Sequence, residues 1–166
     1  MNITFQYTPT TLQAAHELHY KRFFRFQSRL PIFLGMLAVW SGLLLFLILG
    51  KEGNKFLSIS LMVTGAGAML AYYIIMRTLG KRVYNRLSAY HDPFVIEIEE
   101  NHIRMNIKDS HLKIPWAEIK KAVISPEIVL LYPTDRMFYI FPKSNFQENE
   151  FDYFKKLVSE KVPSVF

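Results

Sequence analysis

Two long apolar segments follow each other near the middle of the chain. Leu30–Gly50 and Phe56–Met76 are each 21 residues long and contain no formally charged side chain. As helices with a rise of ~1.5 Å per residue, each would span roughly 31 Å, close to the ~30 Å hydrocarbon core of a bilayer. Only Lys51–Lys55 separates them. The pattern therefore predicts a transmembrane helical hairpin over residues 30–76.

The residues before the hairpin predict a short strand and an amphipathic helix. Apolar and polar side chains alternate over residues 3–7, which is typical of a strand. From about residue 12 to residue 28, apolar side chains recur at the spacing of a helix, with Thr10 or Thr11 as its cap. Residues 1–29 are thus predicted to form an N-terminal strand and a juxtamembrane helix.

Both outer ends of the predicted hairpin are basic. Four cations precede the first apolar segment and four follow the second, within a predicted helix over residues 77–92. Lys and Arg beside membrane helices favour the cytoplasmic side, so both termini are expected in the cytoplasm. Aromatic residues alternate with the first four cations, a pattern also known from RNA binding, but the adjoining apolar segment favours the lipid headgroup layer. The residues predicted to contact anionic lipid of the inner leaflet are Lys21, Arg22, Arg25, Arg29, Arg77, Lys81, Arg82 and Arg86.

Small side chains recur at helical spacing in both apolar segments. Membrane helices associate closely where such residues line up. One interpretation is that the two helices pack on each other, and the alternative is an interface with another copy of the chain. No Asp, Glu, Lys, Arg or His lies inside either segment, which disfavours an ion or proton pathway. The predicted packing positions are Gly35, Gly42, Ser60, Thr64, Gly67, Ala68 and Ala71.

The pattern changes to alternation after Pro93. Six short alternating segments between residues 94 and 141 predict an antiparallel meander, and an amphipathic helix is predicted from about Gln147 to Lys161. A curved antiparallel sheet closed by one helix resembles the pleckstrin-homology-like architecture. That architecture has seven strands, so residues 3–7 are predicted to supply the seventh strand to a cytoplasmic domain over residues 93–166. The predicted fold class is a membrane α-helical hairpin plus an α+β domain.

The charge distribution argues against a nucleic-acid-binding protein. The net charge is +6, but residues 1–92 contribute 10 − 3 = +7 and residues 93–166 contribute 10 − 11 = −1. A nucleic-acid-binding domain would carry the basic excess on its folded part. Here the excess belongs to the segment that contains the hairpin, where it suits a membrane surface.

The sequence predicts no catalytic residue, cofactor or metal site. The chain has no cysteine, so disulfides and thiolate chemistry are excluded. Its five histidines do not show the spacing of converging metal ligands, and no phosphate-binding loop or nucleophile elbow is present. We therefore expect a protein that is not an enzyme.

Two short motifs in the predicted domain resemble the YcxB-like family of bacterial membrane proteins. Ile114-Pro115-Trp116-Ala117-Glu118-Ile119 is similar to a Trp-x-x-Ile signature, carried here by Trp116 and Ile119. Ile140-Phe141-Pro142-Lys143-Ser144-Asn145-Phe146 is similar to the family's approach to its last helix, carried by Pro142 and Phe146. The resemblance implies a protein of the bacterial cytoplasmic membrane and implies no activity.

The leading functional hypothesis is a membrane-tethered, non-enzymatic binding module. The hairpin would hold the domain against the anionic inner leaflet, where the domain would meet an unidentified protein partner through a strand edge or groove. The alternative is an accessory subunit of a transporter or larger membrane assembly that packs through the hairpin.

Overall fold

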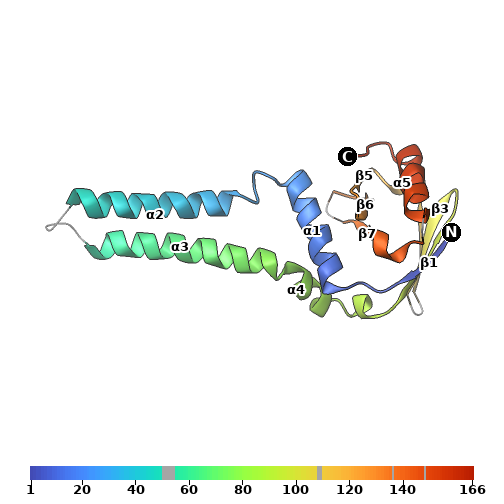
Figure 1. The fold of residues 1–166 in the computed structure, drawn as a ribbon, viewed down its shortest axis with the longest axis horizontal. Coiled ribbons are helices and arrows are strands. Elements are labelled where there is room, and N and C mark those ends of the chain that lie inside the picture. Colours follow the sequence, from blue (N-terminus) through green and yellow to red (C-terminus); the bar gives the residue numbers. More distant parts are fainter. Residues whose placement is uncertain (50–54, 108–109, 136, 148) are drawn as a thin grey trace. The chain divides into compact units, whose positions relative to one another are not determined.

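The computed structural model of the protein describes residues 1–49, 55–107, 110–135, 137–147 and 149–166 (Figure 1). They form two compact units, one of residues 1–15 and 80–166 and one of residues 16–79. The first unit is therefore interrupted in sequence by the second. In chain order the elements are β1 (Asn2–Phe5), α1 (Pro9–Phe23), α2 (Leu30–Leu49), α3 (Lys55–Arg77), α4 (Leu79–Arg86), η1 (Ser88–His91), β2 (Phe94–Ile98), β3 (His102–Ile107), β4 (Ser110–Pro115), η2 (Trp116–Glu118), β5 (Lys121–Ile124), β6 (Ile128–Tyr132), β7 (Tyr139–Pro142), η3 (Lys143–Asn145) and α5 (Glu150–Lys161).

The predicted hairpin is confirmed as two long apolar helices. Leu30–Ile48 of α2 and all of α3 are long and apolar enough to cross a membrane, with mean hydropathies of 2.3 and 1.8. At their outer ends, the Tyr72 hydroxyl donates a hydrogen bond to the Ser28 carbonyl. Residues 50–54, which include most of the predicted connection, lie outside the described residues. Most side chains of both helices are exposed, as expected for surfaces in contact with lipid.

Helix α1 begins earlier and ends earlier than the pattern predicted. Thr8 caps it, because its hydroxyl oxygen accepts a hydrogen bond from the Thr11 amide at 3.1 Å, and Pro9 takes the first helical position, where no amide hydrogen is needed. The predicted cap at Thr10 or Thr11 is thus one turn too late. The helix stops at Phe23, and turns follow to residue 29. There the Ser28 hydroxyl donates to the Arg25 carbonyl, a local bond that competes with helical pairing.

The N-terminal strand joins the sheet of the domain, as predicted. Strand β1 pairs antiparallel with β2, with Phe5 opposite Phe94 and Asn2 opposite Glu97. Strands β2, β3 and β4 continue the sheet in the order β1-β2-β3-β4. The alternation of the sequence sets the face of each residue, so Ile3 and Phe5 are buried and Thr4 is exposed.

The remaining strands form a second sheet, so the predicted single meander is divided in two. Strands β5, β6 and β7 pair in that order, and η2 separates β4 from β5. The break falls at Trp116, whose side chain enters the core and turns the chain from one sheet to the other. Sheets of four and three strands followed by α5 give the seven strands and closing helix of the pleckstrin-homology-like architecture.

One aromatic and aliphatic core lies between the two sheets and α5. All five residues of β6 are buried, and Phe154 and Val158 of α5 are fully covered. The Phe154 ring lies 5.0 Å from the Phe141 ring on β7. Burial of a large apolar side chain contributes about 1.5–3 kcal/mol, so this helix face holds α5 to the sheets.

Helices α1 and α4 meet at Gly80 within the first unit. The Gly80 amide donates to Gln13 Oε1 at 2.8 Å. A Cβ atom on Gly80 would collide with the Pro9 carbonyl oxygen and lie 2.5 Å from the Gln13 nitrogen. The two chain segments that border the hairpin are therefore in direct backbone contact, and only glycine fits at this crossing.

The pairing of β1 predicts that Phe5→Ala destabilises the domain. Phe5 is buried, stacks on Phe94 at 5.7 Å and meets Tyr7 edge to face at 4.9 Å. Loss of a buried Phe side chain costs about 3–5 kcal/mol. We expect a lower free energy of unfolding in denaturant titrations of the full chain, followed by Trp116 fluorescence in a Trp40→Phe background. The matched control is Thr4→Ala, an exposed position of the same strand. Equal effects of the two substitutions would contradict the role of β1.

Candidate functional site

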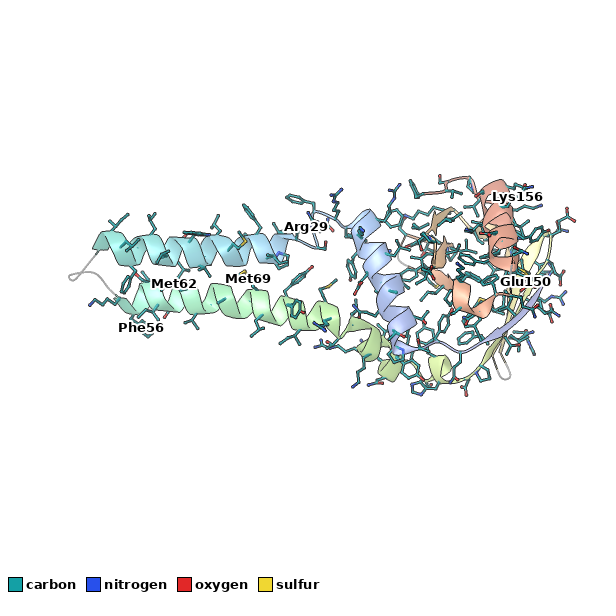
Figure 2. The ribbon with its side chains drawn as sticks, viewed as in Figure 1. Arg29, Phe56, Met62, Met69, Glu150 and Lys156 are labelled. Atoms are coloured by element: carbon teal, nitrogen blue, oxygen red, sulfur yellow. The ribbon has the colours of Figure 1, made fainter. Side chains whose placement is uncertain are left out.

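Small residues hold α2 against α3, but only part of the predicted stripe takes part. A Cβ atom on Gly35 would lie 2.9 Å from the Gly65 carbonyl oxygen, and one on Gly42 would lie 2.7 Å from the Ser58 carbonyl oxygen. A Cβ atom on Gly65 would lie 2.6 Å from the Gly35 carbonyl oxygen. Met62 and Met69 of α3 point toward α2 (Figure 2). Backbones approach this closely only where side chains are absent or small.

The α3 positions in this contact are Ser58 and Gly65, which the sequence analysis did not select. The positions it did select on α3 lie elsewhere: Thr64, Gly67, Ala68 and Ala71 are exposed and Ser60 is half-buried. No atom lies within 4 Å of a Cβ placed on Gly67. The signal that identifies the observed contact is the seven-residue spacing of Ser58 and Gly65, which matches the spacing of Gly35 and Gly42.

All eight predicted membrane-interface cations are exposed within the compact unit to which each belongs. Lys21 and Arg22 lie in the last turn of α1, and Arg25 and Arg29 lie in the turns that follow. Arg77 ends α3, where its guanidinium donates to the Tyr73 hydroxyl at 2.5 Å. The others, Lys81, Arg82 and Arg86, belong to α4. Phe26, between Arg25 and Arg29, is 80% exposed, which gives the turn an apolar group beside its cations.

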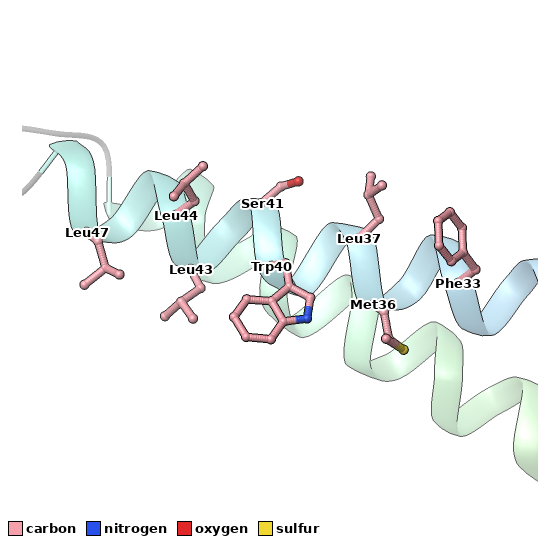
Figure 3. Close-up of a pocket in the computed structure, with 8 residues that line it drawn as sticks. All are labelled: Phe33, Met36, Leu37, Trp40, Ser41, Leu43, Leu44 and Leu47. Carbon is pink, nitrogen blue, oxygen red and sulfur yellow. The ribbon is translucent and has the colours of Figure 1, made fainter.

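The hollow shown in Figure 3 lies on the outer side of α2. It measures about 430 Å³ and is lined by residues of this one helix, from Phe33 to Leu47. Phe33 and Leu37 point away from α3 in this view. A space between side chains of a single apolar helix is ordinary lipid-facing surface, and among its described lining residues only Trp40 and Ser41 carry a polar side-chain group.

Trp116 and Ile119 anchor the junction between the two sheets. The short 3₁₀ turn η2 places side chains three residues apart on one side, so both enter the core, at 4% and 1% exposure. The Trp116 indole donates to the Glu99 carbonyl at 3.0 Å, and its ring faces Phe154 at 6.5 Å. The Trp-x-x-Ile motif is therefore a structural joint rather than an exposed ligand platform.

Pro142 and Phe146 position the start of the last helix. Pro142 is buried opposite Ile128 at the end of β7, and η3 follows it. The Phe146 ring then lies 5.2 Å from both Phe151 and Phe154 of α5. These contacts make the second motif a second structural joint, which shares Phe154 with Trp116.

The polar side chains of the domain form surface pairs rather than a converging site. Arg104 reaches Glu97 and Glu99 at 3.5 and 3.4 Å, and its Nε donates to His102 Nε2 at 3.1 Å. Exposed pairs of this kind contribute little to stability. Within residues 1–49, 55–107, 110–135, 137–147 and 149–166, no three metal-ligating side chains gather where an ion could bind.

Strand β5 is the edge of its sheet, and the end of the sequence lies along it. The Ala122 amide donates to the Ser164 carbonyl at 2.8 Å, the Phe166 amide donates to the Ala122 carbonyl at 3.0 Å, and the Ile124 amide donates to the Phe166 carbonyl at 2.9 Å. The pairing is parallel, with Val165 opposite Ala122. Residues 164–166, which we call the edge segment, thus extend the sheet by one short strand.

The edge segment is held by main-chain hydrogen bonds and by partial burial of its apolar side chains. Val162 is buried after α5, and Val165 and Phe166 are 37% and 45% exposed, so more than half of each side chain is covered. A backbone hydrogen bond contributes about 0.5–1.5 kcal/mol, and burial of apolar surface adds to this. The main chain sets the register of the edge segment on β5.

The other edges differ from β5. Strand β4 carries exposed His111 and Lys113 along its length, and charged side chains discourage pairing at an edge. On β7, the Ile140 carbonyl accepts a hydrogen bond at 3.0 Å from the Tyr7 hydroxyl. Burial raises the pKa of the Tyr7 hydroxyl. At β5 itself, Ala122 and Ile124 carry no charge. The Lys121 ammonium at the start of the strand is bound 2.7 Å from Asp135, and this hydrogen bond lowers the pKa of Asp135.

The fold and these joints define a chain with two helices able to cross a membrane and an α+β domain closed by its last helix. Residues 98–158 match the family model described as YcxB-like protein. The matched segment runs from the end of β2 into α5 and contains both motifs. The match confirms the predicted resemblance to the YcxB-like family over this part of the chain. No significant match was found among curated proteins or among solved structures.

The helix contact predicts opposite outcomes for two glycines of α3. Gly65→Leu places a side chain against the Gly35 backbone and should force α2 and α3 apart, whereas Gly67→Leu meets no atom within 4 Å. Because the chain has no cysteine, spin labels can be attached at Leu37→Cys and Leu70→Cys alone, both exposed positions. We expect Gly65→Leu to lengthen or broaden the label-to-label distance in electron-resonance measurements and Gly67→Leu to leave it unchanged. The same distribution in both variants would refute this helix contact.

Proposed function

We propose that the protein is a membrane-tethered, non-enzymatic module that binds a segment of another protein at the cytoplasmic face of the bacterial inner membrane. The observation that carries the proposal is the edge of β5, which accepts an added strand through its main chain. Strand addition is a common way for a small domain to recognise a protein segment. The hairpin supplies the tether.

The membrane part of the proposal is supported by the apolar helices and their basic flanks. Cations beside a membrane are attracted to anionic lipid by about 1 kcal/mol each. Eight exposed cations border the outer ends of α2 and α3, four on each side. The pairing of β1 with β2 within one domain supports an arrangement with both outer ends on the same side of the membrane. The positive-inside rule favours the cytoplasm as that side.

A second candidate function is an accessory subunit that packs through its hairpin in a larger assembly or with another copy. It is favoured by small residues of α3 outside its closest contact with α2, because Thr64, Gly67, Ala68 and Ala71 are exposed. Small side chains allow a further helix to approach closely. This candidate predicts contacts through α3 rather than through β5.

The proposed orientation predicts which introduced cysteines a membrane-impermeant maleimide can reach. Lys55→Cys, at the start of α3, should be labelled in spheroplasts, and Ser144→Cys, an exposed position of the domain, should be labelled only after lysis. The chain has no cysteine of its own, so the unmodified protein is the control. Labelling of Ser144→Cys before lysis would contradict a cytoplasmic domain.

Photo-crosslinking in living cells separates the two candidate functions. A benzophenone amino acid is placed either at Lys120, which precedes β5 and is exposed, or at Ala68, on the exposed row of α3. The binding module predicts a discrete adduct with another protein from position 120. Adducts from position 68 alone favour the accessory subunit. If neither position gives a discrete adduct, the binding-module proposal is wrong.

A further inference from the structure

We propose that a groove between α2 and α3 holds one acyl chain of an anionic phospholipid, whose phosphate lies beside Arg25 and Arg29. The inference rests on the membrane part of the proposed function and names a lipid partner for the hairpin. The groove measures about 390 Å³. Residues between 27 and 38 line it on one side, and Thr64, Gly65 and Ala68 of α3 line it on the other.

The surface of the groove suits an acyl chain. Leu30, Pro31 and Leu34 line it with apolar side chains, and Gly35 and Gly65 are buried where the two backbones touch. The bilayer core contains no water that could fill a hollow of this kind. Hydrocarbon must therefore fill it, either from a lipid or from another protein segment.

The length of the groove distinguishes a lipid chain from a further helix. From Leu30 to Ala38 the groove follows α2 for about 12 Å, at a rise of ~1.5 Å per residue. One leaflet supplies about half of the ~30 Å hydrocarbon core of a bilayer. A membrane helix of another protein would cross both leaflets, whereas the groove ends within the first. One acyl chain from the leaflet beside the cations matches this length.

The charges at the mouth of the groove favour a phosphate. Gln27 lines the groove and belongs to the turn that carries Arg25 and Arg29, both of which are exposed. Arg29 directly precedes α2 (Figure 2), and the positive end of the helix dipole adds to the attraction for an anion. Basic pockets between membrane helices on the cytoplasmic side bind anionic headgroups. Because Leu30 follows Arg29 and lines the groove, a single lipid molecule reaches both.

The mouth also has a fixed place on the hairpin. The Tyr72 hydroxyl of α3 donates a hydrogen bond to the Ser28 carbonyl, within the same turn as Arg25 and Arg29. This bond holds the turn beside α3, the helix that supplies the other wall of the groove. The headgroup site and the chain site are therefore formed before a lipid binds, which lowers the entropy cost of binding.

The test uses the full chain in phosphatidylcholine nanodiscs that contain a trace of a photoreactive lipid. The two probes are phosphatidylglycerol and phosphatidylcholine with the same diazirine-bearing acyl chain, and labelled residues are mapped by mass spectrometry. We expect the phosphatidylglycerol probe to label residues 64–68 at least about fivefold more than the phosphatidylcholine probe. Residues 43–47, part of the hollow in Figure 3, lie outside the groove and should be labelled equally by both probes.

Two adjacent residues of α3 provide matched variants for the chain site. Ala68→Leu places a larger side chain in the groove, whereas a Cβ atom on Gly67 meets no atom within 4 Å and Gly67 does not line the groove. Ala68→Leu should lower the phosphatidylglycerol labelling of residues 34–38 to the level of the phosphatidylcholine probe, and Gly67→Leu should leave it unchanged. The distance between spin labels at Leu37→Cys and Leu70→Cys shows whether each variant keeps its hairpin.

Two pairs of arginine substitutions provide the matched test of the headgroup site. The double variant R25Q/R29Q removes the cations at the mouth and should lower phosphatidylglycerol labelling of residues 64–68 at least about fivefold. The double variant R82Q/R86Q removes the same charge from α4 and should keep the preference for phosphatidylglycerol. These substitutions leave the helix contact untouched, so they test the site even if Ala68→Leu disturbs the hairpin.

Three results would overturn this inference: equal labelling of residues 64–68 by both probes, equal effects of the two arginine pairs, or a discrete protein adduct from the benzophenone at position 68, which would place another protein in the groove. If the lipid preference is absent while position 120 still forms its adduct, the binding module stands and the lipid site falls. If the preference is present but position 120 forms no adduct in cells, the binding module falls and the lipid site stands.

Discussion

The pairing of β1 with β2 is the constraint on which the rest of the structure depends. Phe5 and Phe94 are opposite each other although the whole hairpin lies between them in sequence. This single antiparallel pairing makes the domain discontinuous in sequence and leaves both candidate membrane helices between its two parts. The contact of Gly80 with Pro9 and Gln13 joins the same two parts of the domain at a second place. The hairpin is thus an insertion within one domain.

An insertion of this kind would make strand pairing expensive if the inserted residues were a flexible loop. Closing a loop costs conformational entropy that grows with its length. Here α2 and α3 pack side by side through Gly35, Gly42 and Gly65, and Tyr72 bonds to the Ser28 carbonyl at their outer ends. The paired helices keep their two outer ends close together, which lowers the entropy cost of pairing β1 with β2.

The elements of this protein could be predicted from the sequence because each has a simple period, whereas most contacts between elements, apart from the pairing of β1 with the domain, could not. Two uncharged segments predicted the hairpin, six alternating segments predicted strands, and an amphipathic segment predicted the closing helix. With the N-terminal strand, the count of seven strands predicted the fold class. The α3 contact at Ser58 and Gly65 and the crossing at Gly80 depend on which of several small residues faces a neighbour. The division into two sheets depends on the direction of Trp116. Composition and spacing do not determine these orientations.

The sequence analysis did not select residues 164–166, because the hydrogen bonds that place them on β5 come from main-chain groups. Recognition through main-chain groups is independent of charge, which suits a domain whose residues 93–166 have a balance of −1 while the cations lie beside the hairpin. In the proposed function the two tasks are separate in the chain: apolar length and cations would hold the protein in the membrane, and a strand edge would meet the partner. An edge without protection would also pair with unrelated strands. Residues 164–166 cover the edge of β5 and limit such pairing.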